Sequence, residues 1–125
     1  MRIQESAENY LETILMLYQA KGAVRSIDIV NALQFSKPSV SVAMKNFREN
    51  GYIHMDTDGY ITLTDAGQEI AERIYERHQL LTEILIRLGV DEETAKNDAC
   101  RIEHDLSDQT FEKIKDYVRR HANEK

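Results

Sequence analysis

The sequence predicts a mainly α-helical protein, with an N-terminal winged helix-turn-helix domain joined by a long helix to a second helical domain. Three observations lead to this prediction. Apolar residues recur at helical spacing through most of the chain. Two short β-prone runs, 52–55 and 60–63, enclose a turn that ends in Asp58-Gly59, as in a β-hairpin. Proline occurs once in 125 residues, so few breaks interrupt the helices.

Three helices are expected before the hairpin, which would form the wing. Each has an apolar face and a serine that can act as N-cap. Pro38 falls in the first turn of the third helix, where proline is tolerated. The expected ranges are 6–20, 26–33 and 36–50, with Ser6, Ser26 and Ser36 as caps.

Three further helices are expected after the hairpin. They cover residues 64–89, 91–106 and a last segment that begins after Ser107, with Thr64, Asp91 and Ser107 as N-caps. This order predicts a domain boundary at the end of the hairpin. Residues 1–63 would be the DNA-binding domain and residues 64–125 the second domain, with helix 64–89 as the connector.

Composition favours a cytoplasmic protein. No apolar run approaches the 18 residues of a membrane span, and the N-terminus has no basic-then-apolar export signal. The single cysteine cannot form an internal disulfide, and an unpaired thiol suits a reducing compartment. We therefore expect a soluble protein with no membrane partner.

The formal net charge of −6 argues against a nucleic-acid partner when taken alone. The charge is uneven, however. Residues 21–54 hold five basic and two acidic side chains, whereas twelve acidic residues follow residue 75. One basic stretch in an acidic chain is typical of a DNA-binding module attached to a metal- or partner-binding domain, although chance scatter would look similar.

The helix-turn-helix at 26–50 is the candidate nucleic-acid interface. The N-terminal turn of a recognition helix enters the major groove, and its residues here are small, polar or basic. Serines can bind phosphates or base edges, valine can contact a thymine methyl group, and basic residues can contact phosphates. The candidates are Arg25, Ser36, Lys37, Pro38, Ser39, Ser41, Val42 and Lys45. The alternative is that these are ordinary cap and solvated surface residues of a domain that never touches DNA.

The segment ACRIEH, 99–104, suggests a metal site. Cys100, Glu103 and His104 would share one face of a helix, because positions i, i+3 and i+4 are neighbours. All three residue types ligate metals. Convergence of the first, fourth and fifth helices would add three further donors from elsewhere in the chain. The full candidate set is Asn9, Glu12, His78, Cys100, Glu103 and His104.

Each of these residues also has an ordinary structural interpretation. A lone cysteine is most often a small buried hydrophobe. Glu103 and His104 could be surface residues, and His78 could be a half-buried histidine with a satisfied hydrogen bond. Glu12 could belong to a solvated acidic face.

Taken together, the two candidate sites resemble those of the metal-dependent transcriptional repressors that include the diphtheria toxin repressor, other iron-dependent regulators and the manganese transport regulators. The resemblance covers nearly the whole chain. The stretches that carry it are AENYLETILML (7–17), SIDIVNALQFSKPSVSVAMKNFRENGYI (26–53), ITLTDAGQEIAERIYERHQLL (61–81) and NDACRIEHDLSD (97–108).

The resemblance implies a homodimer that binds a divalent ion in each subunit and then binds a palindromic operator on double-stranded DNA. It places the dimer contacts in the second domain and the recognition helix at 38–50. By position, it assigns the six metal-ligand candidates to the ion. It also implies a role as a repressor of metal homeostasis genes.

Three departures from the family pattern bear on the metal. Asn9 offers a neutral amide oxygen where relatives often have Asp or Met. Cys100 is the choice of the iron-type branch, whereas the manganese-type branch has a carboxylate there; a thiolate disfavours Mn(II). Thr82 stands where relatives with a second ion have a carboxylate. Because of Cys100, we expect Fe(II) as the first choice, with Mn(II), Co(II) or Zn(II) as alternatives.

Three other functions are alternatives to a metal-dependent repressor. A winged-helix sensor of redox state or a small molecule would use Cys100 as the sensing thiol. A winged-helix interaction module would bind a protein instead of DNA. An enzyme is disfavoured, because the sequence has no activated nucleophile, glycine-rich phosphate loop or separate general base.

Overall fold

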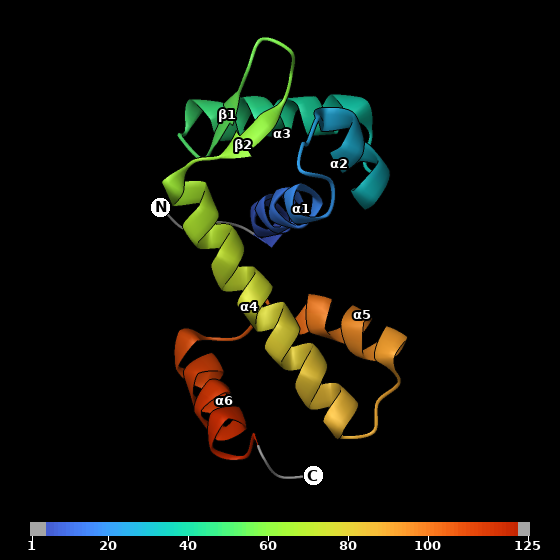
Figure 1. Ribbon diagram of the computed structural model, residues 1–125, viewed down its shortest axis with the longest axis vertical. Coiled ribbons are helices and arrows are strands. Elements are labelled where there is room, and N and C mark those ends of the chain that lie inside the picture. Colours follow the sequence, from blue (N-terminus) through green and yellow to red (C-terminus); the bar gives the residue numbers. More distant parts are fainter. Residues whose placement is uncertain (1–4, 123–125) are drawn as a thin grey trace. The chain divides into compact units, whose positions relative to one another are not determined.

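The computed structural model describes residues 5–122, with the backbone alone at Glu5. Over this range it contains six helices and one antiparallel hairpin (Figure 1). The elements are α1 (Glu5–Lys21), α2 (Ser26–Leu33), α3 (Lys37–Glu49), β1 (Ile53–Met55), β2 (Ile61–Leu63), α4 (Asp65–Arg87), α5 (Glu92–Ile102) and α6 (Asp108–Arg120). The chain forms two compact units that divide between Arg73 and Ile74, inside α4.

The first unit is a winged helix-turn-helix, as predicted. Helix α2 packs against α1 and α3, and the hairpin packs against α1 and α3. In the hairpin, Ile53 pairs with Leu63 and Met55 with Ile61. The segment before α2 lies along the free edge of β2, where the Ile61 N–H donates to the Val24 carbonyl at 2.7 Å. This extra pairing anchors the wing to the start of the helix-turn-helix.

The core of the first unit is apolar and closely packed. Helices α1 to α3, both strands and the segment before α2 contribute apolar side chains that are almost fully buried: Leu11, Ile14, Val24, Ile29, Val40, Met44, Ile53 and Ile61. The Tyr10 ring lies edge-to-face against Phe35 and Phe47, with ring centroids 5.5 and 5.7 Å apart. Burial raises the pKa of the Tyr10 phenol. Edge-to-face aromatic pairs add to the area-based stabilisation of such a core.

The N-cap predictions are confirmed at four helices and wrong at two. The side chains of Ser36, Asp91 and Ser107 accept from the backbone N–H three residues later, and Thr64 does the same for α4. Ser6 lies inside α1 rather than before it, and Ser26 is the first residue of α2. Arg25 is the N-cap of α2, because Asp28 accepts from the Arg25 backbone N–H at 2.9 Å. A carboxylate three residues into the helix thus replaces the expected serine cap.

Gly67 allows the close approach of α4 to Tyr52, which directly precedes β1. A Cβ on Gly67 would lie 2.1 Å from the Tyr52 carbonyl oxygen, which is backbone and cannot rotate away. The same carbonyl accepts from the Thr64 backbone N–H at 3.0 Å, and the Thr64 hydroxyl donates to the Gly51 carbonyl at 2.6 Å. Within the first unit, the start of α4 is therefore held against the segment 51–52 that leads into β1.

The second unit consists of the rest of α4 with α5 and α6. Its buried apolar residues are Ile74, Leu81, Ala95, Ala99 and Phe111. Helix α5 ends at Ile102, whereas the sequence predicted a helix to residue 106. A turn at 103–106 then leads to α6.

No helix in the described part of the chain is long and apolar enough to cross a membrane.

Candidate metal centre and nucleic-acid interface

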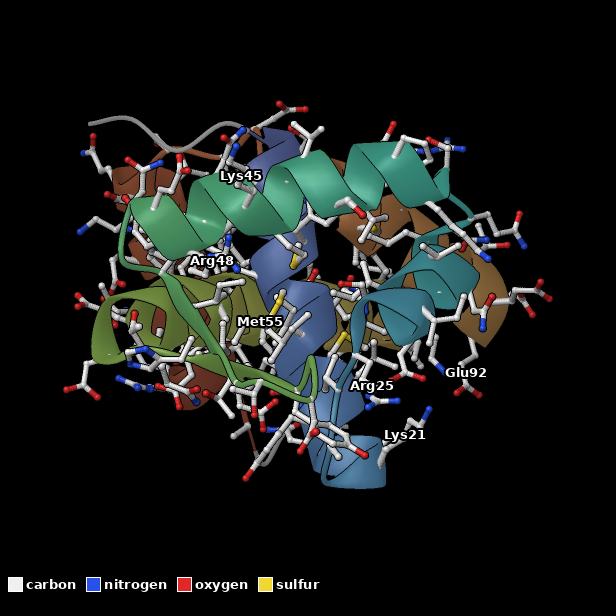
Figure 2. All side chains as sticks on the ribbon, turned by 90° about the horizontal axis from the view of Figure 1, so that it is seen from above. Lys21, Arg25, Lys45, Arg48, Met55 and Glu92 are labelled. Atoms are coloured by element: carbon white, nitrogen blue, oxygen red, sulfur yellow. The ribbon has the colours of Figure 1, made fainter. Side chains whose placement is uncertain are left out.

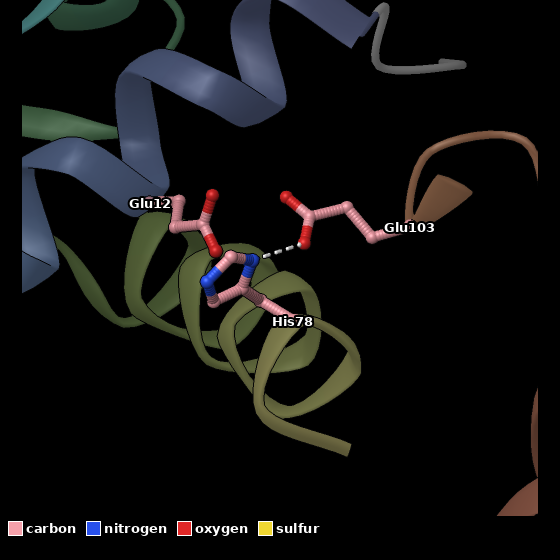
Figure 3. Close-up of side chains that lie close together, drawn as sticks. All are labelled: Glu12, His78 and Glu103. Atoms are coloured by element: carbon pink, nitrogen blue, oxygen red, sulfur yellow. Dashed lines mark hydrogen bonds and ion pairs between the residues drawn. The ribbon is translucent and has the colours of Figure 1, made fainter. Parts of the chain in front are cut away.

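The second unit brings together two of the predicted metal ligands, from helices far apart in the sequence. His78 lies in α4 and Glu103 is the C-cap of α5. The His78 Nδ1 atom is 3.0 Å from Glu103 Oε2, as the dashed line in Figure 3 marks. Glu103 is completely buried, and the His78 side chain is 20% exposed. A buried carboxylate is costly unless an opposite charge or hydrogen-bond donors face it, so this pair is a specific arrangement.

His104 completes a three-residue cluster around the same carboxylate. Its Nε2 lies 3.4 Å from Glu103 Oε1, and its side chain is 1% exposed. His104 belongs to the turn that follows α5, rather than to the helix itself. The helix face that the sequence predicted for Cys100, Glu103 and His104 therefore does not extend to His104. The turn still leaves both histidines beside the two oxygens of one carboxylate.

Cys100 is exposed on α5. The buried stripe of this helix consists of Ala95, Ala99 and Glu103, which recur every four residues. Cys100 follows Ala99 by one position and so falls outside this stripe. Its role as a metal ligand stays a prediction.

The two remaining candidates belong to the first unit. Asn9 and Glu12 are three residues apart on α1 and share a face of that helix. Asn9 is half-buried, and Glu12 is 5% exposed. The burial of Glu12 is unusual for a carboxylate and excludes the solvated acidic face considered above.

The donor chemistry of these residues fits a divalent first-row metal ion. Imidazole nitrogen suits Fe, Co, Ni, Cu and Zn, and carboxylate oxygen suits Mn as well. Glu103 is fully buried, and imidazole nitrogens lie within 3.0 and 3.4 Å of its oxygens. A cation among these groups would offset the charge of the buried carboxylate.

Arg77 is a residue of this region that the sequence analysis missed. It is 5% exposed, and its guanidinium contacts the turn that carries Glu103 and His104. A signal was present in the sequence, because Arg77 interrupts the apolar stripe of α4 between Ile74 and Leu81. A charged residue at a core position indicates a buried, paired charge.

The predicted DNA-contacting residues lie on the surface of the first unit. All eight are exposed, and Val42 is 61% exposed. Figure 2 shows Lys45 and Arg48 on α3, with Arg48 directed toward Met55 of the wing. Ser36 and Ser39 also have a structural role, because the Ser36 hydroxyl accepts from the Ser39 N–H and donates to the Ser39 hydroxyl. An exposed, partly basic helix with a small N-terminal turn is the arrangement that a major groove accepts.

Arg25 is bound to the wing. Its Nη2 donates to the Asp58 carbonyl at 2.6 Å, and its guanidinium lies 4.5 Å from the centre of the Tyr60 ring. These contacts connect the N-cap of α2 to the hairpin turn. Arg25 therefore positions the wing, in addition to any phosphate contact it makes.

Comparison with known proteins finds one matching family model for each part of the chain. Residues 2–61 match the family model "Iron dependent repressor, N-terminal DNA binding domain", and residues 64–123 match "Iron dependent repressor, metal binding and dimerisation domain". The chain is 36% identical over 113 residues to the HTH-type transcriptional regulator MntR of Lysinibacillus sphaericus, covering 90% of this chain and 81% of that protein. MntR of Bacillus subtilis is 37% identical over 113 residues, covering 90% of this chain and 80% of that protein.

Solved structures share the fold. The structure titled "Manganese-dependent transcriptional repressor complex with manganese" has a TM-score of 0.82 at 25% identity, covering 90% of this chain and 52% of that one. The manganese regulator SloR has a TM-score of 0.78 at 24% identity, covering 95% and 55%. The chain thus spans about half the length of these solved chains.

These matches exclude the enzyme interpretation, since the family consists of transcriptional regulators. The two family models together cover nearly the whole chain, and the winged helix and the helical unit each correspond to one of them. The chain belongs to the iron-dependent repressor family of metal-dependent transcriptional regulators.

Proposed function

We propose that this protein is a repressor that binds operator DNA as a homodimer when a divalent metal ion is bound. The buried carboxylate of Glu103, which faces His78 and His104, carries this proposal. It lies in the part of the chain that matches a metal-binding and dimerisation domain. The exposed α3 lies in the part that matches a DNA-binding domain.

We assign the centre of the metal site to His78 and Glu103, which lie together in the second unit (Figure 3). Their chemistry supports this choice, because imidazole nitrogen and carboxylate oxygen both bind divalent first-row ions. The complete proposed ligand set adds Asn9, Glu12, Cys100 and His104 from the sequence prediction.

The proposed ligand set comes from both units of the chain, and this suggests how the metal acts. Asn9 and Glu12 are on α1 of the DNA-binding unit, and the other four are in the second unit. An ion shared between them favours arrangements in which all donors reach it. A ligand shifts an equilibrium only by its differential affinity for the two states. We propose that the metal-bound state spaces the two recognition helices of the dimer for successive major grooves of a palindromic operator.

The choice of metal depends on Cys100. Ligation by its thiolate favours Fe(II) over Mn(II), which is the basis of the Fe(II) prediction. A site built from oxygen and nitrogen donors alone, with Cys100 left at the surface, favours Mn(II) instead. The solved structures whose titles name manganese support this second choice, and Zn(II) and Co(II) remain alternatives.

The proposal is tested by anaerobic titration of the metal-free protein with Fe(II), Mn(II), Co(II) and Zn(II), followed by DNA binding at fixed salt with each ion. We expect one ion to strengthen binding to a palindromic site at least tenfold, about 1.4 kcal/mol. Binding of metal with no change in DNA affinity would reject the metal-dependent switch. A DNA affinity that responds to thiol oxidation instead would support the redox-sensor alternative.

The variant Cys100→Ala decides between the two metal choices. If the thiolate is a ligand, this variant loses its response to Fe(II). If the variant keeps the wild-type response to Mn(II) and Fe(II), Cys100 is not part of the site.

The proposed function places the protein in the cytoplasm, with double-stranded DNA and a second copy of the chain as its partners. Fluorescence anisotropy with DNA duplexes at several salt concentrations separates this proposal from a protein-binding winged helix. Phosphate contacts give a linear fall of log affinity with log salt, which an uncharged protein interface does not.

A further inference from the structure

We propose that Arg77 is a positioning residue for the metal site: it holds the turn at 103–106 so that the Glu103 carboxylate lies between His78 and His104. This inference rests on the proposed metal-binding function. It concerns a residue that is not itself one of the proposed ligands.

The contacts of Arg77 join three segments of the second unit. Its Nη1 donates to the Glu103 carbonyl at 3.2 Å and to the Leu106 carbonyl at 2.8 Å. Its Nη2 donates to Asp108 Oδ1 at 2.5 Å, at the first residue of α6. One side chain of α4 therefore binds the end of α5, the turn and the start of α6.

The Arg77 side chain is buried, so its charge depends on these partners. The Arg77 side chain is 6% exposed, and its guanidinium lies 5.0 Å from the centre of the buried Phe111 ring. The carbonyl groups at the C-terminal end of a helix have no partner within that helix, and a cation near them is stabilised by the helix dipole. Arg77 supplies both the cation and the hydrogen bonds. These bonds satisfy carbonyl groups just beyond the end of α5 at Ile102.

The guanidinium binds the main chain of Glu103 rather than its carboxylate. It donates hydrogen bonds to two carbonyl oxygens and to Asp108, while the Glu103 carboxylate faces the two histidine rings. An arginine paired with that carboxylate would compete with a metal ion for it. Arg77 therefore fixes the ligand without occupying its oxygens, as second-layer partners of metal ligands do.

The test compares Arg77→Met and Arg77→Lys with Arg87→Met, an exposed arginine near the end of the same helix. Two quantities are measured on the full chain: the affinity for Mn(II) by competition with a chelating dye, and the visible absorption spectrum of the Co(II)-loaded protein. We expect Arg77→Met to weaken metal binding about 10–100-fold and to change the Co(II) spectrum, because the ligands lose their fixed geometry. Arg77→Lys, which keeps the charge and part of the hydrogen bonding, should be intermediate, and Arg87→Met should match the wild type.

A purely structural role for Arg77 gives a different pattern. In that case Arg77→Met lowers the melting temperature of the metal-free protein but leaves the Mn(II) affinity and the Co(II) spectrum of the folded protein unchanged, and the proposal is wrong. If Arg77→Met does not fold, Arg77→Lys and Asp108→Ala decide instead. A wild-type affinity and spectrum in both would overturn the proposal.

The variants His78→Ala and Glu103→Ala separate this inference from the proposed function. If both bind Mn(II) as tightly as the wild type, the metal site itself is wrong. If both lose metal while the Arg77 variants keep it, the site stands and the positioning role is rejected.

Discussion

The imidazole of His78 and the carboxylate of Glu103 lie 3.0 Å apart, although 25 residues separate them in the chain. One is half-buried on the long helix α4, and the other is fully buried at the end of α5. This contact, inside the second unit, joins two residues that the sequence suggested as ligands from separate arguments. It is the structural basis of the proposed metal site.

Replacement of Glu103 by glutamine should abolish tight metal binding. The amide has nearly the same size as the carboxylate but carries no charge and offers one oxygen. Loss of a second-layer partner typically weakens metal affinity 10–100-fold, and we expect loss of this ligand to cost about 100-fold or more. Titration calorimetry with Mn(II) measures the effect. The matched control is Glu92→Gln, an exposed glutamate at the start of the same helix, which should bind as the wild type does. Unchanged affinity in Glu103→Gln would contradict the assignment.

Replacement of Lys45 by glutamine should weaken DNA binding equally for all sequences. Lys45 is exposed on α3, and we expect it to contact a phosphate. The slope of log affinity against log salt should fall by about 1, because one fewer counterion is released. Fluorescence anisotropy on specific and random duplexes checks both points. Lys96→Gln, on α5 of the second unit, is the control. A loss confined to one operator sequence would instead indicate that Lys45 contacts a base.

Replacement of Val42 by serine should change sequence preference more than affinity for random DNA. Its side chain is 61% exposed on the face of α3 that we assign to the major groove. A valine methyl that contacts a thymine methyl group contributes to discrimination at one base pair. Binding to operator duplexes with uracil in place of single thymines locates that base pair. Equal losses on every duplex would reject a direct base contact.

Replacement of Gly67 by alanine should destabilise the first unit by about 3 kcal/mol, the upper end of the range for overpacked sites. The new Cβ would lie 2.1 Å from the Tyr52 carbonyl oxygen, so the backbone must move. Urea unfolding followed by circular dichroism measures the change. Glu69→Ala, an exposed position in the same turn of α4, should have little effect. A wild-type midpoint for Gly67→Ala would show that α4 can shift at no cost.

Acid should destabilise the start of α2 through Asp28. The hydrogen bond from the Lys21 ammonium, followed by that from the Arg25 backbone N–H, lowers the pKa of the Asp28 carboxyl. A lowered folded-state pKa contributes stability above the unfolded pKa of about 3.9 and loses it as the pH falls through the folded-state pKa. Below about pH 4, the wild type should therefore lose stability more steeply than Asp28→Asn. Thermal unfolding between pH 2.5 and 7 tests this, and Lys21→Gln should reduce the steepness as well.

Much of the fold was predictable from local patterns. Helical periodicity, the caps Ser36, Asp91 and Ser107 and the Asp-Gly turn are signals that adjacent residues carry. The wrong predictions concern the ends of helices, where contacts between particular residues decide which residue caps or ends the helix. Asp28 accepts from Arg25, so Arg25 rather than Ser26 caps α2. Helix α5 stops at Ile102 rather than at residue 106, and Arg77 binds the Glu103 carbonyl just beyond its end.

The candidate site was predictable as a list of donors but not as a geometry. A cysteine, a glutamate and a histidine at helical spacing suggest one shared face. The structure instead buries the stripe Ala95, Ala99 and Glu103 and leaves Cys100 exposed. Which side of α5 faces the core depends on the packing of α4 and α6, and no spacing within α5 contains that information.

The sequence by itself determined the order of the elements, the winged-helix class and the residue types that can bind a metal or DNA, because periodicity, caps and donor chemistry are properties of short segments. Tertiary structure alone decided that His78 meets Glu103, that Arg77 holds the turn between α5 and α6, and that Arg25 binds the wing. These contacts join residues 25 to 33 positions apart. Such pairs form only when the apolar faces of whole helices are buried against one another, which is a property of the packed chain rather than of any segment in it.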